Sequence, residues 1–329
     1  RSIGFDKFVA LDDFDVDQVA HLREHFRMPG MGSTTARYFR DKLAMRMKAE
    51  EHGIPVPGFT NLFKDLDIQQ FVEQVPAPWL LKPRSEASAT GIKKLHSAEE
   101  LWETVNGLQD HRHRYLVERF APGDVYHVDS LIHQGQVVFS KASKYLDTPF
   151  EVAHGGGIFR SCSLELGSED DTKLKAMNEE VQRAFGMQHS ASHTEFIKSH
   201  ATGEFYFLET SARVGGANLA EMVEASSGIN LWREWAHIEL AVSLDETYEL
   251  PEVKQQYAGI VVSLSRYQHP DTSSFMDTEI CWRMDKDWHI GLIVRSDSAD
   301  RVRALLDLYA GRIAEEFHAS LEPPDAMRL

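Results

Sequence analysis

The chain is poor in cysteine and has no long apolar run. Only two cysteines, Cys162 and Cys281, occur among 329 residues, and their separation matches no metal-ligand spacing. Two isolated thiols are typical of a reducing compartment, so we expect a cytoplasmic protein. No stretch approaches the roughly 18 consecutive apolar residues of a membrane span. The acidic N-terminal segment also lacks the pattern of a signal peptide.

Positive charge is scarce as well. Lysine and arginine number 35 against 51 aspartates and glutamates, which gives a formal net charge of -16. Such a surface repels phosphate backbones and no basic run offsets it, so we expect no nucleic-acid partner and no membrane partner. Any anionic ligand must therefore be held by a few local cations.

The order of apolar runs, turns and helical patterns predicts an α+β protein without internal repeats. Residues 5–11 resemble a strand and a short helix follows. Because these two elements alone cannot bury their faces, we expect a preceding segment with neighbouring strands to be absent from this chain. The expected units are 1–33 as a remnant of an N-terminal domain, 34–77 as a connecting helix and segment, 78–145 and 146–244 as two α+β units, and 245–329 as a C-terminal α+β unit.

The helix expected in the second unit begins at Ser33 or Thr34 and ends at Gly53. One face of it carries an apolar stripe at helical spacing. The members of this stripe are Ala36, Phe39, Leu43 and Met47.

Residues 193–211 predict a β-hairpin. Two strand-like runs flank residues 201–203, where a glycine suits the left-handed position of a three-residue turn. Side chains opposite each other on one face are then close neighbours. The pairs on that face are Glu195 with Glu209, His193 with Ser211, and Ile197 with Phe207.

Two opposed glutamates repel each other by about 3 kcal/mol at an effective dielectric near 20. Oxygen ligands of this kind suit Mg²⁺ beside a nucleotide. Two alternatives remain at this point: one glutamate pairs with a lysine, or the register is shifted by one residue and the carboxylates face apart. If they share a cation, removal of the Glu209 charge should leave the apo fold at least as stable as before.

Two basic residues, Lys82 and Arg213, lie in patterns that suit phosphate. Lys82 ends an apolar strand before a loop of small and hydroxylated residues, 85–91, whose backbone N–H groups can contact phosphate oxygens. Arg213 precedes a glycine pair at the start of a helix, where anions bind favourably. The alternatives are a plain turn at 85–91 and a tight turn with a solvated Arg213. From its pattern alone, Lys42 is an ordinary surface lysine.

Taken in order, five segments resemble motifs of the ATP-grasp superfamily. The resemblance implies two α+β subdomains that clasp ATP, with 78–145 as the small lid and 146–244 as the large subdomain with the metal site. The N-terminal pre-ATP-grasp domain would be incomplete. The segments are RDKLAMRMKAEEHGIPVP (40–57), PWLLKP (78–83), VERFAPGDVYHVD (117–129), HTEF (193–196) and FLETSARVGG (207–216).

The resemblance assigns roles to individual residues. Asp124 lies near the expected ribose carboxylate, although the family residue often stands one position later, at Val125. Arg213 would steady the transferred phosphate as the catalytic residue. The other ATP contacts would be Lys42, Lys82, Ser88, Gly91, Glu118, Arg119 and Phe120. The metal ligands would be Glu195, Glu209 and Ser211, the last in place of the family's asparagine.

The loop EVAHGGGIFRS is expected to select the substrate, and a flexible connector is the alternative. The residues proposed for this role are His154, Arg160, Gly215 and Gly216.

The resemblance implies a ligase that joins a carboxylate, an amino acid or small acid, to an amine. The reaction would pass through an acyl phosphate and release ADP and phosphate, with ATP and Mg²⁺, or Mn²⁺ in its place, as cofactors. The alternatives are another ATP-grasp reaction such as carboxylation, and a non-catalytic or regulatory nucleotide-binding protein. A homodimer is one oligomeric state that the sequence allows.

Overall fold

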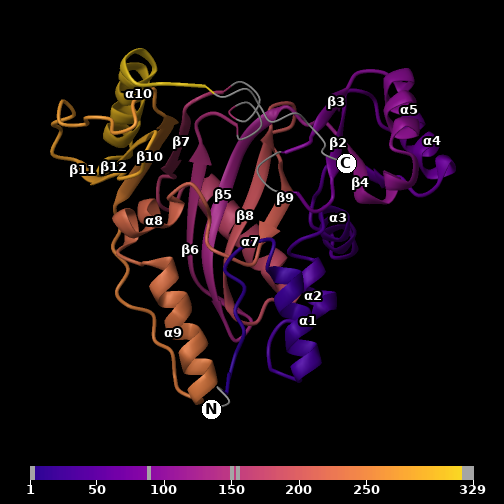
Figure 1. Ribbon diagram of the computed structural model, residues 1–329, viewed down its shortest axis with the longest axis horizontal. Coiled ribbons are helices and arrows are strands. Elements are labelled where there is room, and N and C mark those ends of the chain that lie inside the picture. The colour runs from indigo at the N-terminus through magenta and orange to yellow at the C-terminus, as the bar shows by residue number, and fades with distance from the viewer. Residues whose placement is uncertain (1–3, 87–89, 149–151, 153–155, 321–329) are drawn as a thin grey trace.

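Two antiparallel sheets organise the protein. The computed structural model describes residues 4–86, 90–148, 152 and 156–320 (Figure 1). A four-stranded sheet has the order β1-β4-β2-β3, and an eight-stranded sheet has the order β11-β12-β10-β7-β6-β5-β8-β9. Helices cover both sheets, which confirms the α+β class. Among the described residues, no helix combines the length and apolar character needed to cross a bilayer.

The smaller sheet packs against two helices at one side of the molecule (Figure 1). Its core contains Leu81 from β2 and Val117 from β4, packed on Leu101 and Val105. The side chain of Ser97 accepts a hydrogen bond from Glu100 N and so starts the second helix. The elements are β1 (Phe59–Asn61), α4 (Asp65–Gln74), β2 (Trp79–Pro83), β3 (Lys93–Leu95), α5 (Ala98–Gly107), a 3₁₀ turn (Gln109–Arg114) and β4 (Tyr115–Arg119).

The larger sheet has helices on both faces. One core joins Val128 to Leu174 of the helix α7, and another joins Val261 to the helix α10. On the opposite face, Leu131 packs with residues of α8 and α9. The elements are β5 (Gly123–His133), β6 (Gln136–Tyr145), β7 (Phe159–Ser163), α7 (Glu169–Phe185), β8 (Ser190–Ser199), β9 (Phe205–Ser211), α8 (Leu219–Ser227), α9 (Leu231–Leu244), β10 (Tyr257–Leu264), β11 (Ile280–Arg283), β12 (His289–Ser296) and α10 (Ala299–Glu316).

The two sheets divide the chain differently from the predicted units. β5 and β6 were expected in the unit 78–145, but β5 pairs along its length with β8 and therefore belongs to the larger sheet. β1 and α4, expected in the connecting segment, complete the smaller sheet and its cover. The strands β10 to β12 of the C-terminal unit extend the larger sheet through β7.

The N-terminal elements also differ from the prediction. Residues 5–11 form no strand in the described structure, where α1 (Val16–Phe26) is the first regular element. The single helix expected up to Gly53 is split into α2 (Ser33–Arg37) and α3 (Lys42–Glu51). Met47, expected in its buried stripe, is 59% exposed.

Asp41 causes the split. Its backbone is extended and its side chain accepts hydrogen bonds from the N–H groups of Leu43 and Ala44, which makes it the N-cap of α3. The same carboxylate accepts hydrogen bonds from Arg84. A new helix therefore starts at Lys42.

The predicted register of the hairpin is confirmed at the two glutamates. Glu195 of β8 pairs with Glu209 of β9, and His193 pairs with Ser211. The two carboxylates therefore project from directly opposed positions on one face of the sheet.

The prediction is wrong nearer the turn. The strands are joined by residues 200–204, a longer loop than the three residues expected. Near the turn, the strands pair one residue away from the predicted register. A bulge leaves Leu208 without a partner in the ladder and restores the predicted register at Glu209. Ile197 therefore pairs with Tyr206, and Phe207 turns to the opposite face from the one predicted.

A neutral polar network fixes the hairpin from the face that α7 covers. Gln182 donates hydrogen bonds to the hydroxyls of Thr194 and Thr210, 3.0 and 3.2 Å away. These two hydroxyls are also hydrogen-bonded to each other at 2.8 Å. All three side chains are buried, so the network ties β8 and β9 to α7 and stabilises the hairpin on this face.

We predict that Gly123→Ala destabilises the protein by about 1–3 kcal/mol. A Cβ at this position would lie 2.3 Å from the backbone oxygen of Lys198 on β8, and that oxygen cannot move without disturbing the ladder. Gly311→Ala is the control, because a Cβ there meets nothing within 4 Å. Alanine in α10 should raise the unfolding free energy by about 0.5–1 kcal/mol. Urea unfolding measures both changes, and equal midpoints for Gly123→Ala and the parent would contradict the clash.

Candidate functional site

A cavity of about 660 Å³ lies between the two sheets and brings together most of the predicted site residues. The smaller sheet and α3 supply its lysines, and β8 and β9 supply Glu195 and Glu209. The predicted residues that line the cavity are Lys42, Lys82, Glu118, Arg119, Phe120, Glu195, Glu209, Ser211, Arg213 and Gly216. Ser88 and His154 lie outside the described residues.

Lys42 is held at the cavity by its position at the start of α3. Its Nζ lies 2.7 Å from Glu209 Oε2 and donates a hydrogen bond to the carbonyl oxygen of Glu86, also at 2.7 Å. Burial alone would raise the pKa of Glu209, but the Lys42 charge lowers that pKa to about 2. The lysine–glutamate pair left open by the sequence is therefore present. Loss of the Glu209 charge is expected to weaken the apo fold slightly, contrary to the expectation from repulsion alone.

Glu118 lies at the centre of a buried ion cluster. Its Oε2 accepts hydrogen bonds from Nε and Nη2 of Arg46, at 3.0 and 2.8 Å, and its Oε1 pairs with Lys82. Burial alone would raise the pKa of Glu118, but Arg46 and Lys82 keep it below its usual range. Because its carboxylate is fully engaged, Glu118 can meet an adenine only through its backbone.

Arg46 was missed by the sequence analysis. It is fully buried, and its third donor group, Nη1, binds the carbonyl oxygen of Leu208 in the β9 bulge. The available signal was its spacing: Arg46 follows Lys42 by four residues, which places both on one face of α3.

Glu195 is held by two neighbours on the same face of the sheet. The Tyr145 hydroxyl donates a hydrogen bond to Glu195 Oε1 at 2.9 Å, and His193 Nε2 lies 3.5 Å from the same oxygen. With Glu209 directly opposite and Ser211 two residues further along β9, the donor set consists of oxygen atoms only. These residues fit a hard divalent cation such as Mg²⁺.

Arg213 has a partner that the sequence did not indicate. Its Nε donates to Asp13 Oδ2 at 2.8 Å, and its Nη1 donates to the carbonyl oxygen of Val214. Burial would lower the pKa of Arg213, but the Asp13 carboxylate raises it. Because 200 residues separate the pair and Asp13 lies in an acidic segment, local pattern offered no signal for it. Arg213 is therefore neither solvated nor free.

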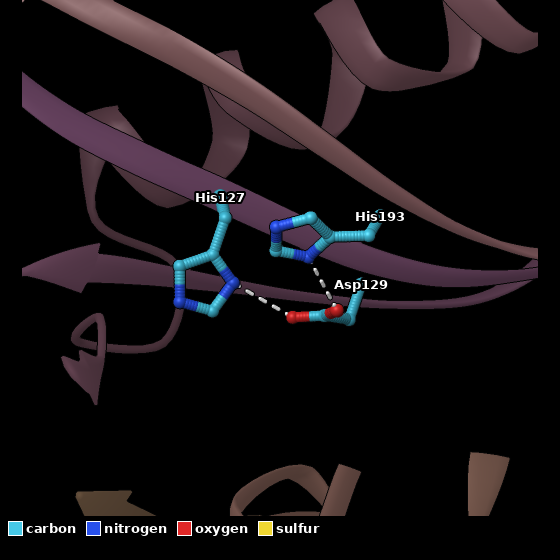
Figure 2. Close-up of side chains that lie close together, drawn as sticks. All are labelled: His127, Asp129 and His193. Atoms are coloured by element: carbon cyan, nitrogen blue, oxygen red, sulfur yellow. Dashed lines mark hydrogen bonds and ion pairs between the residues drawn. The ribbon is translucent and has the colours of Figure 1, made fainter. Parts of the chain in front are cut away.

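A buried His–Asp–His cluster lies beside Glu195 on the cavity face. In Figure 2 the Asp129 carboxylate lies between two imidazole rings: His127 Nδ1 is 2.7 Å from Oδ2, and His193 Nδ1 is 2.8 Å from Oδ1. Burial would lower the pKa of His193, but Asp129 raises it to about 10. The pKa of Asp129 lies far below its usual range because both histidines outweigh its burial. The sequence signal for this cluster was the alternation H-V-D at 127–129, which places the first and third side chains on one face of a strand.

Two predicted ligand contacts are not supported by the structure. Asp124 is paired with Lys144 at 2.7 Å and is not among the cavity-lining residues, because strand alternation turns it to the face opposite Val125. Val125 lines the cavity but has no polar group for a ribose. Arg160 binds Asp147 and Asp307, both within 2.8 Å, and so links β7 to α10.

Two predicted glycine contacts lie outside the cavity lining. A Cβ on Gly215 would approach Asp129 Oδ1 to 2.7 Å, so this glycine lets the backbone cover the His–Asp–His cluster. Gly91 has a φ of +70°, which glycine accommodates readily.

The two sheets, the cavity between them and the ATP-grasp motifs that line it define an ATP-grasp fold. The chain has this fold and is similar in sequence to ligases of the ATP-grasp superfamily. No protein-family model matches it. It is 27% identical over 243 residues to an L-arginine-specific L-amino acid ligase of Bacillus subtilis, covering 71% of this chain and 57% of that protein. A D-alanine–D-alanine ligase of Neisseria gonorrhoeae is 23% identical over 204 residues, covering 61% and 66%.

Solved structures agree with this fold. The L-amino acid ligase from Bacillus licheniformis superposes with a TM-score of 0.71 at 18% identity, covering 95% of this chain and 81% of that one. The biotin carboxylase domain of a Hydrogenobacter thermophilus 2-oxoglutarate carboxylase, solved with MgADP, gives 0.66 at 16% identity, covering 89% and 72%. The chain spans only 57% and 66% of the two sequence relatives.

We predict that Glu118→Gln costs about 3–5 kcal/mol of unfolding free energy, because it leaves the charges of Arg46 and Lys82 buried without a counter-ion. The control Glu51→Gln removes an exposed pair with Lys48 and should cost at most about 1 kcal/mol. Urea unfolding at pH 7 measures both.

The lowered pKa of Glu118 sets how its contribution to the unfolding free energy depends on pH. Since the folded pKa of Glu118 is lowered, its stabilisation is present above the unfolded pKa of about 4.3 and is lost as the pH falls through the folded value. The stability gap between the parent and Glu118→Gln should therefore narrow in acid. A constant gap from pH 7 to pH 3 would contradict this ionisation.

Proposed function

We propose that this protein is an ATP-dependent ligase that joins the carboxylate of an amino acid or small acid to an amine. The observation that carries the proposal is the direct opposition of Glu195 and Glu209 in a cavity that also contains Lys42 and Lys82. Opposed carboxylates destabilise a sheet unless a cation lies between or beside them. Two lysines on the facing wall suit the phosphates that would accompany such a cation.

The nucleotide would lie along the smaller sheet. Lys42 and Lys82 would contact phosphate oxygens, together with the loop at 85–91, and the backbone of residues 118–120 would border the adenine. Lys42, Lys82 and residues 118–120 all line the cavity. The sequence relatives are named as ligases of amino acids, which supports amino acids as the substrate class.

The metal ligands would be Glu195, Glu209 and Ser211. A bound Mg²⁺ would supply neutralisation of the phosphate charge. Glu209 would then no longer need Lys42 as its counter-ion, which leaves that ammonium group for a phosphate oxygen. The MgADP in the carboxylase structure of the same fold supports this cofactor.

The chemistry would consist of two transfers. The γ-phosphoryl group passes from ATP to a carboxylate oxygen of the substrate, which gives ADP and an acyl phosphate. The amine then attacks the carbonyl carbon, and inorganic phosphate leaves with the electron pair of the broken C–O bond. Phosphoryl transfer depends mainly on positioning and charge neutralisation, which the lysines and Arg213 would provide.

We predict that the protein with Mg·ATP and pairs of L-amino acids releases ADP and phosphate, and that ATP alone is not hydrolysed. Coupled phosphate detection and mass spectrometry of the ligated product measure this. Glu209→Gln should abolish release because a metal ligand is lost. Its control is Glu204→Gln in the same hairpin, where an exposed pair with Lys173 is removed and release should persist. Normal release by Glu209→Gln would exclude the metal assignment.

We also predict that Arg213→Ala lowers turnover by about 10²–10³-fold, as loss of a charge-stabilising donor commonly does. The affinity for Mg·ATP should change much less, because the charge matters most as negative charge moves towards the acyl phosphate. Turnover assays and calorimetric titration with Mg·ADP separate the two quantities. A parallel loss of both would assign Arg213 to nucleotide binding instead.

A further inference from the structure

The His–Asp–His cluster continues into the proposed metal site. From Asp129, hydrogen bonds run to His193 and on to the Tyr145 hydroxyl, 3.2 Å from His193 Nε2. The same hydroxyl is 2.9 Å from Glu195 Oε1. The side chains come from β5, β8 and β6, all on the cavity face of the larger sheet. Asp129 is fully buried, and the chain of contacts ends at the carboxylate that faces Glu209.

The direction of each hydrogen bond is fixed by its partner. The ionised Asp129 carboxylate can only accept, so His193 Nδ1–H donates to it. The Tyr145 hydroxyl gives its single proton to Glu195, so its oxygen accepts from His193 Nε2–H. The imidazole of His193 is therefore held at both nitrogens, and its ring orientation fixes the Tyr145 hydroxyl.

The cluster itself has the geometry of a hydrogen-bonded array and not of a metal centre. Each oxygen of Asp129 already accepts from one histidine, at 2.7 and 2.8 Å. Around a tetrahedral zinc ion with bonds near 2.0–2.1 Å, ligand atoms would be about 3.3 Å apart. The outer nitrogens are also engaged: His127 Nε2 lies 2.7 Å from Ser161 Oγ, and His193 Nε2 meets Tyr145.

We propose that Asp129, His193 and Tyr145 form a positioning array that aims the Glu195 carboxylate at Glu209 for a divalent cation. The proposal rests on the proposed function, since it needs a cation between the two carboxylates. Ligating carboxylates are themselves commonly held by hydrogen bonds, and loss of such a partner typically costs 10–100-fold in metal affinity. Opposed carboxylates repel each other, so without a donor on its far side Glu195 would turn away from Glu209.

Gly215 provides a second structural sign of the array. Its ideal Cβ position lies 2.7 Å from Asp129 Oδ1 and 2.8 Å from His193 Nδ1. Backbone therefore lies directly over the Asp129–His193 hydrogen bond and helps to bury it. Gly215, the first glycine of the pair that follows Arg213, therefore lets the backbone cover the array.

The test uses Mn²⁺ as a paramagnetic probe, with ADP at saturating concentration. Electron paramagnetic resonance measures the dissociation constant of Mn²⁺ for the parent, Tyr145→Phe and Asp129→Asn. Both variants should raise this constant by about 10-fold or more. The affinity for ADP without metal should stay within about twofold, because neither side chain belongs to the proposed nucleotide contacts.

The matched control is Thr194→Val. Thr194 lies between His193 and Glu195 on β8, but its hydroxyl belongs to the network on the opposite face. This variant should lower the melting temperature and leave the Mn²⁺ dissociation constant unchanged. A purely structural role of the array would instead affect all three variants alike. Tyr145→Phe keeps its ring packing, so it remains informative if Asp129→Asn fails to fold.

Three outcomes would overturn the proposal. Unchanged Mn²⁺ affinity in Tyr145→Phe and Asp129→Asn would exclude the positioning role of the array and leave the proposed function unaffected. Failure of the parent to bind Mn²⁺ with ADP would overturn both. A metal ion that elemental analysis finds in the purified parent without nucleotide, and that Asp129→Asn loses, would make the cluster of His127, Asp129 and His193 a metal centre of its own.

Discussion

The buried ion cluster at Glu118 is the interaction on which the cleft depends. One carboxylate of the smaller sheet binds Arg46 from α3 and Lys82 from β2, and the remaining donor group of Arg46 reaches the bulge of β9. The two sheets are therefore held at a fixed separation by charges that cannot be left unpaired in the interior. The apolar cores of the two sheets are separate, so this polar contact joins two separately packed layers.

The cleft of this acidic protein pairs three of its cations with carboxylates. Lys42 is paired with Glu209, Lys82 with Glu118, and Arg213 with Asp13. These pairs keep the cations ordered before any ligand is present, since a paired side chain has already lost much of its rotamer freedom. Under the proposed function, an incoming phosphate would compete with a carboxylate for a cation that is already in place.

Sequence reasoning succeeded where short-range pattern sets the structure. The opposition of Glu195 and Glu209 followed from a turn and strand alternation. The break at Asp41 was missed because its capping geometry is fixed partly by Arg84, a residue 43 positions away. The membership of β5 in the larger sheet depends on pairing with β8, which no local pattern encodes. The Asp13 contact was inaccessible for the same reason.

The bulge at Leu208 separates the strand register near the turn of the hairpin from the register at its carboxylates. Residues 200–204 form a turn whose length sets the register of the outer half, whereas the bulge restores the register at Glu209. A one-residue change in the length of this turn can thus be absorbed before it reaches the carboxylates. Over evolutionary time, the tip of the hairpin is free to gain or lose a residue and to acquire new surface properties, while the chemistry at its base stays aligned.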